Sequence, residues 1–117
     1  MAFKFESLKI WQRALEYSLS ISELTKGFPK IEQFELASQM RRTGDSICLN
    51  IAEGSAGNSK KEFAQFLRYS RRSLIETVGC LIVAKRKGYV EEKIFNEVYS
   101  EAEELSKMIS GFINSLR

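Results

Sequence analysis

The chain contains no histidine, only one proline and only two cysteines among its 117 residues. Without histidine, the commonest general base of enzymes is missing, and no other residues have the spacing of a catalytic site. Cys48 and Cys80 form no ligand cluster, so they fit reduced, buried thiols better than a disulfide or a metal site. We therefore expect no enzyme activity, no catalytic residues, no cofactor and no metal.

Long hydrophobic stretches are also missing. The longest, residues 78–84, ends at Lys85 and is far shorter than the roughly 18–20 apolar residues of a membrane span. The N-terminal residues lack the apolar run of a signal peptide. With 44% hydrophobic and 28% charged residues, the composition predicts a folded cytoplasmic domain without membrane contact.

Four segments show the three-and-four spacing of amphipathic helices. Ser7 is expected to cap the first helix, Gly27 to end it in a left-handed conformation, and Gly88 to end the third. Ser59 and Glu62 have the spacing of a capping box at the start of the third helix. The short connections predict an all-α, single-domain, antiparallel up-down-up-down four-helix bundle over residues 1–117. The expected helices cover residues of about 8–26, 32–54, 60–87 and 92–116.

The predicted core follows the apolar face of each helix. In the first helix this row is Trp11, Leu15, Ser18 or Leu19, and Ile21 or Ser22. The row of the second helix is Leu36, Met40, Ile47 and Ile51. The row of the third is Phe63, Phe66 or Leu67, Ser70, Leu74, Thr77 or Val78, and Leu81. The row of the fourth is Phe95, Val98, Ala102, Leu105, Ile109, Phe112 and Leu116. Residues 77–84 of the third helix are apolar nearly all round, which favours a subunit interface over an unusually deep helix.

Positive charge is concentrated in the middle of the chain. Residues 41–88 carry ten basic and four acidic side chains, whereas residues 89–117 carry three basic and six acidic ones. Arg68, Arg71 and Arg72 form a basic cluster on the third helix. This cluster has two interpretations: a surface for phosphates, or a solvated face neutralised by the glutamate-rich fourth helix.

A polar stripe on the second helix, Ser46, Asn50 and Glu53, flanks its apolar row. A ligand or partner site is one interpretation. We favour a hydrogen-bond network to the third helix or to the turn before it, because half-buried polar groups need partners.

The second helix and the start of the third closely resemble a known family. The residues that carry this resemblance are Ser38-Gln39-Met40-Arg41-Arg42, Ser46-Ile47, Asn50-Ile51-Ala52-Glu53-Gly54, Ser59-Lys60-Lys61-Glu62-Phe63 and Phe66-Leu67. They resemble the four-helix-bundle proteins encoded in intervening sequences of bacterial 23S ribosomal RNA genes, also named S23 ribosomal protein-like. The chain is also similar to the accessory protein of diversity-generating retroelements, which partners a reverse transcriptase and binds nucleic acid. The resemblance implies a homo-oligomeric ring of five subunits.

Two functional hypotheses follow. The first is a non-catalytic homo-oligomer that binds RNA or DNA through phosphate contacts. The second is a scaffold that binds another protein and has no nucleic-acid ligand. For the first hypothesis, the predicted nucleic-acid-binding residues are Arg41, Arg42, Lys60, Lys61, Arg68, Arg71 and Arg72.

Overall fold

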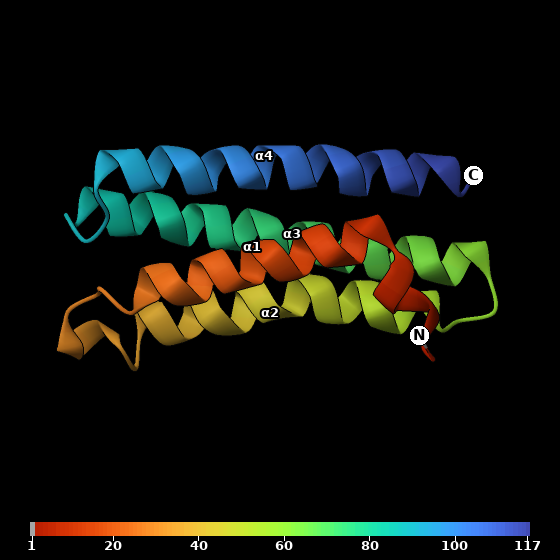
Figure 1. Cartoon of the computed structure of the whole chain (residues 1–117), viewed down its shortest axis with the longest axis horizontal. Coiled ribbons are helices and arrows are strands. Elements are labelled where there is room, and N and C mark those ends of the chain that lie inside the picture. Colours follow the sequence, from red (N-terminus) through yellow and green to blue (C-terminus); the bar gives the residue numbers. More distant parts are fainter. Residues whose placement is uncertain (1) are drawn as a thin grey trace.

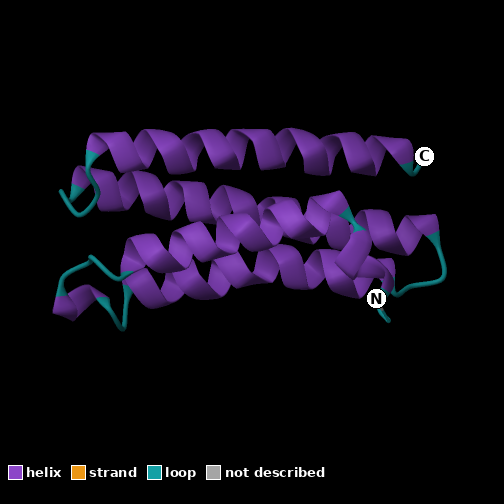
Figure 2. Cartoon of the chain, in the orientation of Figure 1, coloured by secondary structure: helices purple, strands orange, loops and turns teal. Residues whose placement is uncertain are grey.

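The structure, a computed structural model, describes residues 2–117, and these form helices and short connections without any strand. The all-α prediction is therefore confirmed (Figure 2). In chain order the elements are the 3-10 helix η1 (Lys4–Ser7), α1 (Lys9–Thr25), the 3-10 helix η2 (Lys30–Glu32), α2 (Leu36–Ser55), α3 (Lys60–Arg86) and α4 (Glu92–Ser115).

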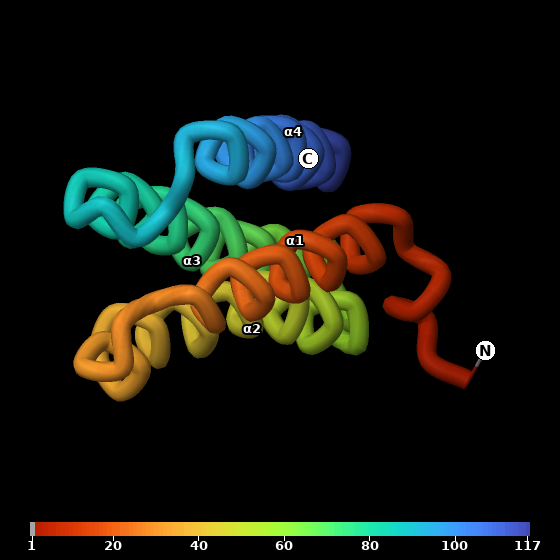
Figure 3. The backbone as a smooth tube through the Cα atoms, turned by 60° about the vertical axis from the view of Figure 1, so that its left-hand side comes forward, coloured from red at the N-terminus to blue at the C-terminus, as the bar shows by residue number. Residues whose placement is uncertain are grey.

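The four long helices lie lengthwise beside one another in a body of 44 × 23 × 22 Å (Figure 1). The α1–α2 and α3–α4 connections lie at one end, and the α2–α3 connection lies at the other. Each helix packs against two others: α2 and α4 both contact α1 and α3. The turned view likewise places α4 along α3 and α1 along α2 (Figure 3). The chain thus forms one four-helix domain.

Two of the predicted helix ends are confirmed and two are wrong. The Ser59 hydroxyl accepts the Glu62 amide at 3.0 Å, which is the first of the two bonds of the expected capping box, and Gly88 ends α3 with a φ of 83°. Ser7 does not cap α1, because its hydroxyl donates to the Lys4 carbonyl within η1. Gly27 is not left-handed either: its amide donates to the Leu24 carbonyl at 3.3 Å, which ends α1 in a right-handed turn.

The second helix begins later than predicted, at Leu36 rather than near Glu32. The backbone at Glu35 has a φ of −119° and a ψ of −101°, outside the helical region. The Gln33 side-chain amide donates to the carbonyls of Thr25 at 2.9 Å and Phe28 at 3.0 Å. Residue 33 is therefore tied to the end of α1, and α2 begins only after this connection.

The predicted apolar rows of α2, α3 and α4 supply most of the buried core. In α1 the prediction is only partly right: Ser18 and Ile21 are buried, whereas Trp11 and Leu15 are half-buried at the edge of the core. The buried residues of α1 are Ile10, Ala14, Tyr17, Ser18, Ile21 and Thr25. Leu19 is 56% exposed, and Trp11 packs against Phe5 of η1 with ring centroids 4.9 Å apart. Tyr17 points inward because its hydroxyl lies 2.8 Å from the Thr77 hydroxyl of α3, which satisfies its polar end.

Candidate functional site

The polar stripe on α2 is a hydrogen-bond network, as favoured from the sequence. The hydroxyls of Ser46 and Ser73 of α3 lie 3.0 Å apart. The Asn50 amide donates to the Ser46 carbonyl at 2.8 Å and to its hydroxyl at 3.0 Å. Glu53, by contrast, is exposed. The network joins α2 to α3, so these side chains have a structural role.

Arg41 is turned into the α1–α2 connection. Its guanidinium donates to the Thr25 hydroxyl at 3.2 Å, to the Gln33 side-chain oxygen at 3.3 Å and to the Gln33 carbonyl at 3.1 Å. Half-buried and surrounded by these acceptors, Arg41 holds the connection against the start of α2.

Arg71 faces the fourth helix. Its guanidinium donates to the Ser110 hydroxyl of α4 at 3.3 Å, and the side chain is half-buried. The cluster predicted from the sequence is therefore split, with Arg71 between two helices and its neighbours Arg68 and Arg72 exposed.

Lys61, Arg68 and Arg72 are exposed and follow one line along α3, because their spacings of seven and four residues repeat the helical turn. We call these three residues the α3 basic strip. Ion pairs among residues 2–117 involve the cations of Arg13, Lys26 and Lys87 and none of the strip. Within residues 2–117, no glutamate of α4 forms an ion pair with the strip.

The acidic residue that follows the strip on α3 faces another helix. The Glu76 carboxylate accepts from the Thr43 hydroxyl of α2 at 2.9 Å and from the Gln39 amide at 3.4 Å. The positive charge of Arg72, one turn earlier, is therefore left facing solvent.

Two aromatic residues accompany the strip, and the predicted nucleic-acid-binding residues did not include them. Phe66 and Tyr69 stack edge-on with ring centroids 5.7 Å apart, and Tyr69 is 40% exposed. With Lys61 and Arg68 they line a hollow of about 580 Å³. The missed signal is the interleaving of aromatic and basic residues on one helix face.

The remaining two predicted residues lie elsewhere. Arg42 is exposed and lines a hollow with Lys87 and Glu32, which form an ion pair of 3.1 Å. Lys60 lies at the start of α3 and lines a hollow with Lys4 of η1. The structure therefore brings three of the seven predicted residues into one line and places the other four in separate environments.

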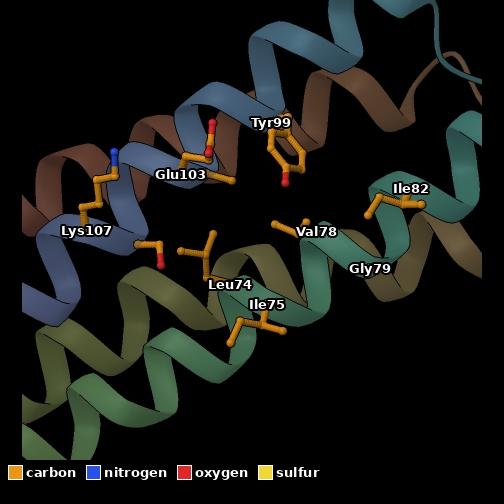
Figure 4. A pocket seen from close by; sticks show the side chains of 10 residues that line it. Leu74, Ile75, Val78, Gly79, Ile82, Tyr99, Glu103 and Lys107 are labelled. Atoms are coloured by element: carbon orange, nitrogen blue, oxygen red, sulfur yellow. The ribbon is translucent and has the colours of Figure 1, made fainter.

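A groove of about 510 Å³ between α3 and α4 lies next to the basic strip along α3. Ile75, Gly79 and Ile82 of α3 line one side, and Tyr99, Glu103 and Lys107 of α4 line the other, with the Tyr99 side chain pointing toward α3 (Figure 4). Ile75 is 63% exposed, and Ile82 and Val83 are each 44% exposed. We call this the α3–α4 groove. The apolar stretch predicted around residues 77–84 is thus partly uncovered in a single chain.

Other kinds of site find little support in the described part of the chain. Residues 2–117 contain no group of three or more His, Cys, Asp or Glu side chains that could hold a metal ion. None of their helices is long and apolar enough to cross a membrane. Cys48 and Cys80 are free and buried, and burial raises the pKa of both thiols. Both cysteines therefore pack as small apolar side chains.

The family model of the 23S rRNA-intervening sequence proteins matches residues 6–111. The chain belongs to this family. The match includes all of α1, α2 and α3 and most of α4, so it covers both the α3 basic strip and the α3–α4 groove.

The fold is shared with a solved protein of related name. That protein, of unknown function and from the S23 ribosomal protein family of Bacteroides thetaiotaomicron, is 24% identical to this chain. The similarity covers 89% of this chain and 97% of that one, with a TM-score of 0.83. No curated protein matches the chain. These comparisons establish the family and the fold.

Proposed function

We propose that this family member is a non-catalytic, self-associating helical bundle that binds nucleic acid through the outer face of α3. The α3 basic strip carries the proposal: Lys61, Arg68 and Arg72 are exposed, aligned and without a carboxylate partner in residues 2–117. A formal net charge of only +3 conceals this local excess.

Phosphates are the ligand that suits this strip best. Lys61 and Arg72 are separated by about 16 Å of helix, so the strip can contact several phosphates of one strand. Such contacts release counterions and carry no base specificity, so binding should be sensitive to salt and tolerant of sequence. Tyr69 adds an exposed ring on which an unpaired base can stack.

Arg41 and Arg71 are left out of the proposed contact set. Both guanidinium groups are half-buried and donate to acceptors on other elements, so drawing them to phosphates would break bonds that hold the bundle together. Arg68 donates only to Gln65 of its own helix, at 3.1 Å and in an exposed position. Arg42 and Lys60 extend the positive surface beyond the strip, at the α1–α2 connection and at the start of α3.

Self-association is the second part of the proposal. Ile75, Ile82 and Val83 form an exposed apolar surface on α3, and burying such a surface between subunits removes it from water. A closed symmetric assembly would repeat the α3 basic strip on every subunit and so multiply the positive potential met by a nucleic acid. The family resemblance favours a ring of five.

Fluorescence anisotropy with a labelled RNA hairpin and a DNA duplex at low salt tests nucleic-acid binding. Replacing two strip arginines (Arg68→Gln with Arg72→Gln) should weaken binding by about tenfold or more, because two phosphate contacts are lost. The variant Lys9→Gln with Lys93→Gln removes the same charge from exposed positions on α1 and α4 and should bind within about twofold of the native chain.

The same assay can reject this role. If the native chain binds neither probe, or if both double variants lose the same affinity, the strip is not a nucleic-acid site. A protein-binding scaffold then becomes the better account of the chain.

Sedimentation velocity tests self-association. The substitution Ile82→Lys places a charge in the α3–α4 groove and should shift the native oligomer toward the monomer. Leu49→Lys on α2, where the native leucine is 63% exposed, is the matched control and should leave the oligomer intact. A native chain that sediments as a monomer at all concentrations would exclude self-association.

A further inference from the structure

A second groove, of about 670 Å³, lies between α1 and α4. Its apolar part includes Leu19 of α1 and Ile94 of α4, which are 56% and 38% exposed. Val90 and Val98, which are buried, lie in the same lining. We call this the α1–α4 groove. Two large aliphatic side chains are therefore left in water beside a hydrophobic floor.

The rest of this lining is strongly negative. The carboxylates of five glutamates line the α1–α4 groove: Glu16, Glu23, Glu91, Glu97 and Glu101. None of the described lysines or arginines lines it. Within residues 2–117, one of the five is ion-paired, since Lys26 contacts Glu23 at 3.0 Å. The groove thus combines apolar contacts with four carboxylates that form no ion pair within residues 2–117.

Glu101 is the half-buried carboxylate of this groove. Both of its carboxylate oxygens lie 3.1 Å from the Ser20 hydroxyl of α1. Burial raises the pKa of Glu101, and the negative charges of Glu16 and Glu97 also raise it, whereas the Ser20 hydrogen bond and the positive charge of Arg13 lower it. A cation placed here would relieve this repulsion between like charges.

We propose that the α1–α4 groove binds a basic amphipathic helix of another protein. Such a helix would pack apolar residues, spaced by three and four, on Leu19 and Ile94, and its flanking lysines or arginines would pair with the glutamates. This is the helix-in-groove mode of recognition, with charge complementarity setting the choice of partner.

The chemistry of the groove selects this occupant over a nucleic acid. Phosphates would be repelled by the glutamates, whereas a basic helix gains both ion pairs and apolar burial. The groove involves α1 and α4 and not α3, so the α3 basic strip would stay available in the complex. The proposal goes beyond nucleic-acid binding and is tested without any nucleic acid.

The probe is a fluorescein-labelled synthetic peptide of about 18 residues, long enough for about five helical turns. Leucines occupy one helical face and lysines flank them. A scrambled peptide of the same composition lacks that face. Anisotropy titrations with the native chain should show that the patterned peptide binds about tenfold or more tightly than the scrambled one. Only the patterned peptide can place a row of leucines on the apolar lining of the groove.

Substitutions locate the bound peptide on the chain. Leu19→Ala combined with Glu97→Gln should weaken binding by about tenfold or more. Leu49→Ala combined with Glu53→Gln makes the same exchange at exposed positions of α2 and should bind within about twofold of the native chain. Circular dichroism checks that both variants remain helical.

Three results would overturn the proposal. One is equal binding of the patterned and scrambled peptides, which indicates nonspecific charge attraction. Another is an equal loss of affinity in the two double variants. The third is that neither peptide binds the native chain. If Leu19→Ala with Glu97→Gln then also abolishes self-association, the groove binds a second copy of this chain and not a basic helix of another protein.

Discussion

At the scale of single residues, Arg41 and Arg42 are neighbours with different environments. Arg41 donates three hydrogen bonds within the α1–α2 connection, whereas Arg42 is exposed. The sequence predicts that adjacent helical side chains point in different directions. It cannot tell which one meets an acceptor, because the acceptors of Arg41 are presented by a turn that has no periodic pattern.

The two arginines therefore predict different effects on stability. Arg41→Gln should lower the free energy of unfolding by about 1–3 kcal/mol, because the Gln33 carbonyl and the Thr25 hydroxyl lose a charged donor. Arg42→Gln should change it by less than about 0.5 kcal/mol. Urea unfolding measures both, and equal losses would contradict the structural role of Arg41.

Tyr17 gives stability a dependence on alkaline pH. Burial raises the pKa of its hydroxyl from 10.0 to about 12, although the Thr77 hydrogen bond lowers it somewhat. Because the folded-state pKa lies above the unfolded value, this contribution is complete below pH 10.0 and is lost as the pH rises toward 12.

We expect the native chain to lose about 1 kcal/mol more than Tyr17→Phe between roughly pH 9 and 11, since only the native chain has this group to ionise on unfolding. Urea unfolding of both chains at the two pH values measures the difference. Identical losses in the two chains would show that Tyr17 ionises freely in the folded state.

At the scale of the helices, two glycines have opposite expected roles. A Cβ at Gly54 of α2 would lie 2.6 Å from the Cβ of Phe66 and 3.0 Å from a ring carbon of Phe63, so α2 and α3 approach too closely there for any side chain. A Cβ at Gly111 of α4 would meet nothing within 4 Å.

Alanine at these positions should shift stability in opposite directions. Gly54→Ala should cost about 1–3 kcal/mol through overpacking, despite the better helix propensity of alanine. Gly111→Ala should stabilise the chain by about 0.5–1 kcal/mol. Thermal unfolding distinguishes the two, and stabilisation by both substitutions would show that α2 and α3 can separate at little cost.

The helices themselves were largely predictable, because long amphipathic periods and the Ser59 and Gly88 signals are local properties of the sequence. The errors arise from tertiary contacts. The core face of α1 is set by the partner that Tyr17 finds on α3, and the start of α2 is delayed by the bonds of Gln33 to the end of α1. Neither contact is visible in a periodic pattern.

The candidate site was only partly predictable for the same reason. The sequence gives the number of positive charges but not their hydrogen-bond partners. The bond from Arg71 to Ser110 of α4, which distinguishes Arg71 from the exposed Arg68 and Arg72, therefore could not be predicted. Tyr69 could have been included, because it lies among basic residues on the same helix.

At the scale of the whole molecule, the two kinds of charge gather on different elements. The α3 basic strip is exposed on one helix, and glutamates line the groove between two others. On the two proposals above, this separation would let the chain hold a phosphate backbone and a basic helix at the same time, which net charge alone would not predict.

The salt dependence of nucleic-acid binding should follow from the strip. The logarithm of the binding constant should fall linearly with the logarithm of salt concentration, with a slope of about 0.7–0.9 for each phosphate contacted. Arg68→Gln with Arg72→Gln should reduce the magnitude of this slope by about 1 to 2. An unchanged slope would mean that these arginines do not contact phosphates.

Lysine footprinting of the native chain tests the central claim most directly. Amines are acetylated with and without a saturating RNA hairpin, and the rate at each lysine is read by mass spectrometry. The α3 basic strip predicts severalfold slower modification of Lys61 in the complex, with the rates at Lys9 and Lys93 unchanged. An unchanged rate at Lys61, or protection of Lys9 and Lys93 in its place, would contradict the assignment of nucleic-acid binding to α3.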